Sequence, residues 1–349
     1  MKLRKPDLFL LLFLLCAFFI YSSPFFSPYW KYFSILNIFV PFFLVFHFVI
    51  LVISFRKKKW KRFLLLAFIG IFAFSFLKST LSFSIKFSSI KEKTISVLSY
   101  NVHGFNKPAN NDFRKTDVRK TKEMVSTIAG FDADIICLQE FFDFEASEVY
   151  NSIEQITKSG FDYFAFDPVI ISRSGKKECK FGNIIFSRFP ILSQKTIKFD
   201  SLNNNQIICC DIVVRKDTVR VFNAHIASLN KANSNITIVE KYIINSDKRM
   251  KQTQILLKEL NESPYRIILC GDFNDIPYSY TYYCLSGCMK NCFEKSGTGF
   301  GFSYPSEFPL LRIDNIFAGQ GIEVIDFSTH NTIKYSDHLP ISAKFILEN

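Results

Sequence analysis

The chain has 349 residues, with 43 lysines and arginines against 31 aspartates and glutamates, and 17% of its residues are aromatic. Residues 1–90 contain twelve of the basic residues and a single acidic residue, Asp7. The formal charge of +12 therefore belongs almost wholly to the first quarter of the chain. The remainder is close to neutral, so the net charge of that region gives no support to a nucleic-acid partner, although a local basic patch is still compatible with the sequence.

Three apolar runs in the first quarter are long enough to cross a bilayer as helices. They are predicted at residues 8–26, 32–55 and 63–80, and they make residues 1–87 a membrane anchor. Two alternatives stay open. The third and shortest run could lie at the membrane interface, and the first could be a cleaved signal peptide, although no small-residue cleavage site follows it. His47, inside the second run, is interpreted as a buried and hydrogen-bonded histidine.

Basic residues cluster on one side of these runs. Lys2, Arg4 and Lys5 precede the first run and residues 56–62 follow the second, whereas the loop between the first two runs holds Lys31 alone. By the positive-inside rule, the amino terminus and the 56–62 loop are cytoplasmic. Three spans then place the rest of the chain on the non-cytoplasmic side. If the third run does not span, that region is cytoplasmic.

From about residue 92 to the carboxyl terminus, short β-branched and apolar runs alternate with helical patterns, as in a soluble α/β domain. Strands are expected at residues 95–100, 134–139, 183–187, 191–199, 207–214, 218–223, 266–269, 312–317, 322–327 and 341–346. Helices are expected at residues 118–129, 146–156 and 237–260. A region of this length is too large for a single sheet with one helical layer.

Polar side chains gather at the ends of these strands. They are Asn101, Glu140, His225, Asp272, Asn274, Asp337 and His338. In open α/β sheets the chemistry collects at the carboxyl ends of the strands. Phosphate hydrolysis assisted by a hard cation needs oxygen ligands, a group that orients water, and donors to the phosphoryl oxygens. The set supplies all three.

The stretch Cys270-Gly271-Asp272-Phe273-Asn274-Asp275 is the centre of this pattern. Asp272 can ligate a hard cation or take a proton from water, while Asn274 can orient that water or an oxyanion. Taken alone, the hexapeptide is more typical of an Asx-rich turn after a strand. The interpretation of Asp272 and Asn274 as catalytic residues therefore depends on the polar residues at the ends of the other strands.

The nine cysteines do not fix the cellular compartment. Cys137 and Cys270 lie in expected core strands, where free thiols behave as small apolar groups. Cys284, Cys288 and Cys292 recur every four residues and could share one helical face. A metal site would need a fourth ligand and closer pairing, so structural thiols or disulfides are favoured there.

Seven segments resemble, in order, motifs of the endonuclease/exonuclease/phosphatase superfamily, which includes DNase I, abasic-site endonucleases, neutral sphingomyelinases and inositol-polyphosphate phosphatases. They are residues 99–102, 138–140, 182–188, 223–225, 271–274, 312–316 and 336–340. Each motif is weak alone, but seven in order are specific. The resemblance implies a four-layer α/β sandwich, in which two facing mixed β-sheets are flanked by helices, and it makes residues 92–349 the catalytic domain.

The resemblance also implies roles for the polar strand ends. Glu140 would be the main Mg²⁺ ligand, with Asn101 and Asp337 beside it, and Mn²⁺ is the alternative ion. Asp272 would orient and deprotonate the attacking water. Asn274 would hold the scissile phosphate or the nucleophile.

The resemblance also implies roles for two histidines and for Asp314. His225 would donate to a phosphoryl oxygen. Asp314 would hold and polarise His338, which would stabilise charge on the phosphate in the transition state. Two alternatives are that Asp314 pairs with Arg312 instead and that Asn101 only caps a turn. His103 and His330 are interpreted as ordinary, and Arg188 as part of the framework.

These observations favour a membrane-anchored, Mg²⁺-dependent phosphoesterase that hydrolyses a phosphodiester or phosphomonoester by metal-assisted attack of water. The near-neutral catalytic region and the anchor favour a lipid head group or small phosphoester over nucleic acid, because a nuclease needs a basic groove to neutralise phosphates. A DNase I-like endonuclease is one alternative. A catalytically silent, membrane-tethered binding module is the other. The expected partners are therefore the phosphoester substrate and the lipid bilayer.

Overall fold

The structure is a computed structural model that describes residues 5–84, 94–107, 117–174, 177–199, 205–228, 237–305 and 311–348. It contains two compact units. The first combines the chain up to Leu81 with residues 237–253 and Asp275–Gly287. The second combines Ser82–Ser228, Gln254–Asn274 and Cys288–Asn349.

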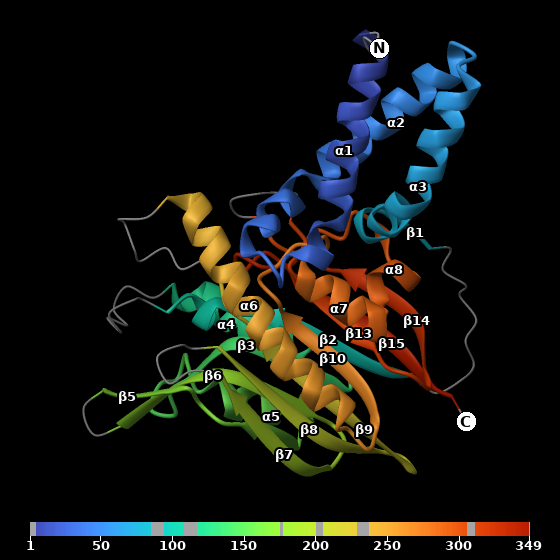
Figure 1. Cartoon of the computed structure of the whole chain (residues 1–349). Coiled ribbons are helices and arrows are strands. Elements are labelled where there is room, and N and C mark those ends of the chain that lie inside the picture. Colours follow the sequence, from blue (N-terminus) through green and yellow to red (C-terminus); the bar gives the residue numbers. More distant parts are fainter. Residues whose placement is uncertain are drawn as a thin grey trace. The chain divides into compact units, whose positions relative to one another are not determined.

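Apolar helices dominate the first unit (Figure 1). They are α1 (Lys5–Phe26), the 3₁₀ helix η1 (Lys31–Phe39), α2 (Val40–Arg56) and α3 (Trp60–Thr80). Asp7–Phe26, Lys31–Arg56 and Trp60–Thr80 are each long and apolar enough to cross a membrane. Each predicted run therefore corresponds to a helical segment of spanning length.

A histidine links these three helices. The hydroxyl of Tyr21 lies 3.1 Å from Nδ1 of His47, and Nε2 of His47 lies 3.0 Å from the carbonyl oxygen of Leu66. Both ring nitrogens of His47 therefore have partners, as the interpretation of a bonded histidine requires. Asp7 and Arg62 form an ion pair of 2.6 Å, so the beginnings of α1 and α3 are neighbours.

The first unit also contains most of α6 (Ile238–Asn261) and of α7 (Tyr280–Cys288). Thr237 and Glu240 start α6 with a capping box: the Glu240 carboxylate accepts from the Thr237 amide at 2.8 Å, and the Thr237 hydroxyl accepts from the Glu240 amide at 3.2 Å. Farther along α6, Arg249 pairs with Asp275 at 3.1 Å, and both side chains are buried.

Two mixed β-sheets form the second unit (Figure 1). One has the order β14-β15-β2-β3-β6-β4, with β5 also paired to β6. Its strands are β2 (Ile95–Asn101), β3 (Ile135–Asp143), β4 (Tyr163–Phe166), β5 (Ile170–Ser174), β6 (Lys177–Ser187), β14 (Ile322–Thr329) and β15 (Ile341–Leu347). Strands β2 and β3 are parallel and the remaining pairs are antiparallel.

The second sheet has the order β11-β13-β10-β9-β8-β7. Its strands are β7 (Ile191–Lys198), β8 (Gln206–Val214), β9 (Asp217–His225), β10 (Arg266–Asp272), β11 (Lys290–Asn291) and β13 (Asp314–Ala318). Strands β9 and β10 are parallel. A separate short pair joins β1 (Ser82–Phe83) to β12 (Thr298–Gly299).

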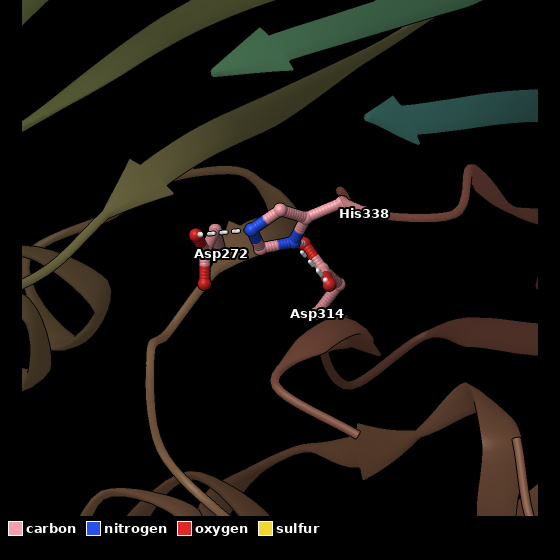
Figure 2. Close-up of side chains that lie close together, drawn as sticks. All are labelled: Asp272, Asp314 and His338. Carbon is pink, nitrogen blue, oxygen red and sulfur yellow. Dashed lines mark hydrogen bonds and ion pairs between the residues drawn. The ribbon is translucent and has the colours of Figure 1, made fainter. Parts of the chain in front are cut away.

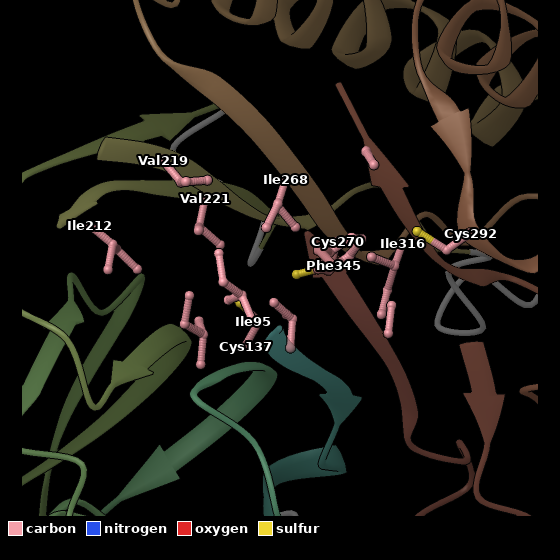
Figure 3. Close-up of a cluster of buried hydrophobic side chains, with 14 of the residues drawn as sticks. Ile95, Cys137, Ile212, Val219, Val221, Ile268, Cys270, Cys292, Ile316 and Phe345 are labelled. Carbon is pink, nitrogen blue, oxygen red and sulfur yellow. The ribbon is translucent and has the colours of Figure 1, made fainter. Parts of the chain in front are cut away.

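The main core lies between the two sheets (Figure 3). Alternate residues of the first sheet, such as Ile95 and Cys137, face residues of the second, such as Val221 and Cys270. A strand directs every second side chain to the same face, so period-two apolar patterns on both sheets produce one shared core. The nine cysteines are free thiols, and several belong to this core.

A second core forms on the outer face of the first sheet. Helix α4 (Val118–Ala129) buries Met124, Val125 and Ile128 there, because their spacing places them on one helical face. The Asp117 side chain accepts from the Lys120 amide at 3.0 Å and so caps the helix. The fold class implied by the resemblance is confirmed: mixed sheets flanked by helices, preceded by three apolar helices.

Two expectations about helices were wrong. The helix expected at residues 146–156 is reduced to α5 (Ser152–Thr157), because the Ser147 hydroxyl accepts from the Val149 and Tyr150 amides and stabilises a turn instead. The three cysteines spaced four apart do not share a helix. Cys284 and Cys288 belong to α7, but strand β11 intervenes before Cys292 opens α8 (Cys292–Ser296).

Candidate active site

Polar side chains from four strands of the second unit meet at one edge of the two sheets. Asn101 ends β2, Glu140 lies in β3, His225 ends β9 and Asp272 ends β10. Asp272 pairs directly with His225 and Asp314 in the sheet, which fixes these three residues next to each other. Carboxyl ends of parallel strands lie at the same edge, so both parallel pairs contribute to one site.

A β-bulge directs Glu140 into this site. The register of β3 against β6 shifts between Leu138 and Phe141, and Glu140 has a φ of 52°. Leu138 and Phe141 both point to the outer core although three positions separate them, because the bulge adds one residue. A regular strand would instead place Glu140 on the same face as Leu138, beneath the outer helices. Backbone strain of this kind is common at functional sites.

Asp272 is the most connected carboxylate of the site. It is 1% exposed. Its Oδ2 accepts from Nδ2 of Asn101 at 3.0 Å, and its Oδ1 accepts from the amide of Asn274 at 2.8 Å. Nε2 of His225 lies 3.8 Å from Oδ2 and Nε2 of His338 lies 3.6 Å from it. Burial raises the pKa of Asp272, and the nearby His338 opposes that rise.

Asn274 supports Asp272 directly. Its side-chain amide donates to the carbonyl of Ile226 at 3.0 Å and to Oδ2 of Asp272 at 3.2 Å. Its φ of 48° turns the chain back so that the amide of Asn274 also reaches the Asp272 carboxylate. In this arrangement, Asn274 orients the carboxylate of Asp272 at the end of β10.

His338 lies between two buried aspartates (Figure 2). Its Nδ1 is 2.9 Å from Oδ2 of Asp314, and its Nε2 faces Asp272 on the other side of the ring. Burial alone lowers the pKa of His338, but the charges of Asp314 and Asp272 outweigh it and raise the pKa to about 10. The two flanking carboxylates therefore favour the imidazolium form of His338, and the alternative pairing of Asp314 with Arg312 is not the arrangement observed.

Glu140 and Asp337 form the more open side of the site. Their side chains are 28% and 29% exposed, and Nδ1 of His103 lies 3.9 Å from Oε2 of Glu140 and 3.5 Å from Oδ1 of Asp337. Within the described part of the chain, neither carboxylate has an ion pair with lysine or arginine. Asn101 donates to Oε1 of Glu140 at 3.2 Å.

This donor set suits a hard cation such as Mg²⁺. Two partly exposed carboxylates, which have no lysine or arginine counter-charge among the described residues, lie near a side-chain amide, and oxygen ligands are those that hard divalent ions prefer. His225 supports the same assignment, because its Nε2 is 3.7 Å from Oε1 of Glu140 and neither ring nitrogen has a hydrogen-bond partner within the part of the chain that the structure describes. A buried imidazole in that state needs a ligand or water.

A second group could also hold an ion. Among the described residues, Asp272, Asp314 and His338 offer ligand atoms that all lie within 4.8 Å of one another. All three are buried, however, and the short bond to Asp314 already occupies Nδ1 of His338. This group is better suited to moving or holding a proton than to a hydrated cation.

A network of buried side-chain amides links the strands that contribute to the site. Asn223 of β9 donates to the carbonyls of Leu138 and Ile184 at 2.9 Å each, and it accepts from Nε2 of Gln139 at 2.7 Å. Asn183 of β6 donates to the carbonyl of Gln206 at 3.1 Å. These bonds link the two sheets directly behind Glu140 and His225. The motifs that contain these amides therefore also have a structural role.

Two neighbours of the site were missed from the sequence. His103 was interpreted as ordinary, but it contacts Glu140 and Asp337, and its position two residues after Asn101 was the available signal. Tyr304 places its ring 4.8 Å from the His338 ring, centroid to centroid. No pattern around Tyr304 pointed to the site. Arg188 bonds to the carbonyls of Ala133 and Ser159, as a framework residue does.

Residues 98–338 match the Endonuclease/Exonuclease/phosphatase family, so the chain belongs to that family. The family domain is one of phosphoesterase- and nuclease-type hydrolases, whose members generally use divalent metal ions. Among curated proteins, the chain is similar to the uncharacterized protein YbhP of Escherichia coli K12, with 24% identity over 275 residues that cover 73% of this chain and 97% of YbhP.

Solved structures share the fold of the second unit. An endonuclease/exonuclease/phosphatase from Beutenbergia cavernae has a TM-score of 0.56 at 15% identity, covering 74% of this chain and 72% of its own. A family protein from Bacteroides thetaiotaomicron has a TM-score of 0.55 at 14% identity, covering 74% and 100%. TDP2 of D. rerio, complexed with a single-strand DNA product, has a TM-score of 0.52 at 16% identity, covering 73% and 100%.

Proposed function

We propose that this chain is a membrane-anchored, divalent-metal-dependent phosphoesterase that hydrolyses a phosphodiester or phosphomonoester by direct attack of water. The observation that carries the proposal is the buried Asp272 carboxylate, held by two asparagines and flanked by two imidazoles beside the partly exposed Glu140. Such an arrangement combines a proton acceptor, cationic or neutral donors and oxygen ligands within one site.

Glu140, Asn101 and Asp337 are the proposed metal ligands, and Mg²⁺ is the expected ion, with Mn²⁺ as the alternative. A divalent ion bound there would neutralise phosphoryl charge and acidify water without a covalent intermediate. Asp272 is the proposed acceptor of the proton from the attacking water. Its raised pKa makes it a better base than an ordinary aspartate.

The two histidines act on the phosphoryl group in this proposal. The imidazolium of His338 keeps Nε2–H available as a donor, and Asp314 fixes the ring through Nδ1. Charge that builds on a phosphoryl oxygen is stabilised by such a preorganised donor. His225 offers a second donor, because neither of its ring nitrogens has a hydrogen-bond partner among the described residues.

Lipid head groups and small phosphoesters are the favoured substrates, because the anchor holds the enzyme at a bilayer and the region after residue 90 has nearly equal numbers of acidic and basic residues. Nucleic acid is the second candidate. It is supported by the fold similarity to TDP2, which was solved with single-strand DNA product.

The test uses the full chain in detergent with Mg²⁺, Mn²⁺ or a chelator. Substrates are plasmid DNA, RNA, sphingomyelin, phosphoinositides and bis(p-nitrophenyl) phosphate. We expect metal-dependent cleavage that Asp272→Ala abolishes and that Asp217→Ala retains, since Asp217 forms an exposed ion pair with Arg266. Activity that survives Asp272→Ala would refute the mechanism, and cleavage confined to DNA would refute the lipid preference.

The membrane part of the proposal has its own test. We propose that three spans place the catalytic region on the non-cytoplasmic side, because basic residues flank the amino terminus and residues 56–62. A reporter fused near residue 89 should be active in its extracytoplasmic form. A reporter that is active only in the cytoplasm contradicts the three-span topology.

A further inference from the structure

A pocket of about 800 Å³ lies beside His338 in the second unit. Its walls come from the segment around Phe300 and Phe302, from the end of β14 at Phe327, and from Leu339. The other half of the lining is polar and consists of Thr298, Ser328, Thr329, Asn331, Thr332 and Lys334. Pockets of this size hold small organic ligands, and apolar side chains combined with polar groups are their usual lining.

The pocket wall is tied to the proposed catalytic pair. Leu339 follows His338 directly, so their Cα atoms are about 3.8 Å apart. The Leu339 amide donates to the carbonyl of Ser303 at 2.7 Å, and the Ser303 hydroxyl accepts from the Asp314 amide at 3.0 Å. Ser303 therefore connects the aromatic wall to Asp314 and to Leu339, the residue that follows His338.

Two phenylalanines form the aromatic wall. The rings of Phe300 and Phe302 are parallel within 1°, with centroids 5.2 Å apart. Gly301 between them has a φ of 63°, and a Cβ there would lie 2.5 Å from the ring of Phe293. The Phe-Gly-Phe sequence thus brings the backbone close to Phe293 while both rings stay on one side. Phe300 is 49% exposed, so its ring is accessible to a ligand.

We propose that this pocket is the subsite for the apolar alkyl or acyl portion of a lipid phosphoester, and the inference rests on the function proposed above. The exposed ring of Phe300 and the partly exposed ring of Phe302 offer apolar surface to a hydrocarbon chain, next to the buried side chains of Phe327 and Leu339. Lys334 in the lining offers charge to an anionic head group. An enzyme anchored by apolar helices remains at the bilayer that contains such substrates.

The experiment uses the full chain in detergent and p-nitrophenyl phosphodiesters whose second ester is methyl, butyl or hexyl. We expect kcat/KM to rise about fourfold per methylene, the equivalent of 0.8 kcal/mol, until the pocket is filled. Phe300→Ala should weaken this dependence and lower kcat/KM for the hexyl ester about tenfold relative to the parent, with little change for the methyl ester. Phe300→Leu keeps an apolar side chain and should retain most of the dependence.

Phe164→Ala is the matched control. Phe164 is 45% exposed and lies on β4, at the opposite edge of the same sheet from β14. Because detergent partitioning affects every variant alike, the comparison is the ratio of hexyl to methyl ester turnover in each. The control should keep the parental ratio, and equal ratios in Phe300→Ala and Phe164→Ala would overturn the subsite.

Other outcomes separate the two proposals. If neither a diester nor p-nitrophenyl phosphate is cleaved under any metal condition, the proposed function fails and the subsite with it. If only the monoester is cleaved, the subsite is refuted while the hydrolase stands. If cleavage occurs but does not depend on chain length, the subsite is refuted while the hydrolase stands. If thymidine 5′-(p-nitrophenyl phosphate) is preferred over the hexyl ester and Phe300→Ala removes that preference, the pocket binds a base and the lipid assignment is overturned.

Discussion

Replacing Asp314 by asparagine would test the charge beside His338. The Asp314 carboxylate lies 2.9 and 3.1 Å from Nδ1 of His338, which is 5% exposed. Two opposite unit charges whose centres are about 4 Å apart attract by about 4 kcal/mol at an effective dielectric constant near 20. Asparagine removes that charge and keeps nearly the same shape. We therefore expect kcat to fall by roughly a hundredfold to a thousandfold.

The assay is steady-state hydrolysis of bis(p-nitrophenyl) phosphate with saturating Mg²⁺ by the full chain in detergent. Because His338 is proposed to act on charge that develops in the transition state, kcat should fall while KM changes little. Asp217→Asn, which removes the same charge from an exposed ion pair with Arg266, is the control and should remain within twofold. A kcat within threefold of the parent in Asp314→Asn, with an unchanged melting temperature, would refute this reasoning.

Gly271→Ala should prevent folding, because Gly271 has a φ of 145° and a Cβ there would lie 1.9 Å from the backbone oxygen of Ala224. The control is Gly287→Ala, where a Cβ would have no neighbouring atom within 4 Å among the described residues, and this variant should melt at or above the parental temperature. Asn223→Ala should destabilise the chain by about 3 kcal/mol in chemical denaturation, because three buried hydrogen bonds between the sheets are lost. Burial alone raises the pKa of Asp211, but bonds from Arg220 lower it below 3.8. A carboxylate whose pKa is lower in the folded state than in the unfolded state stabilises the fold at pH values above the unfolded-state pKa. Asp211→Asn should therefore lower the free energy of unfolding by about 2 kcal/mol at pH 7. The difference in stability between parent and variant should shrink as pH falls below about 3.8.

Long, strongly patterned elements were predicted well from the sequence. The helix expected at residues 118–129 has those bounds, because its apolar spacing and the Asp117 cap act locally. The strand expected at 207–214 differs from β8 by one residue. The expected helix at 146–156 was wrong, since a hydroxyl-stabilised turn at Ser147 outweighed the apolar pattern.

The candidate site was predictable as a set of residue types but not as a geometry. The polar strand ends pointed to Asp272 and His338, since carboxylates and histidines at several strand ends have few purely structural explanations. The bulge at Glu140 left no sequence signal, because a β-bulge depends on the pairing of β3 with β6. The proximity of His103 to Asp337 depends on contacts between residues more than 200 positions apart.

Local chemistry therefore determined the apolar helices, most strands and the family to which this chain belongs, because side-chain spacing and short motifs act over a few residues. Only the tertiary structure decided that His338 lies between Asp314 and Asp272, that Asn223 links the two sheets, and that an aromatic pocket adjoins the site. Those features arise where strands distant in sequence pair and pack, and the pairing register is set by the whole core.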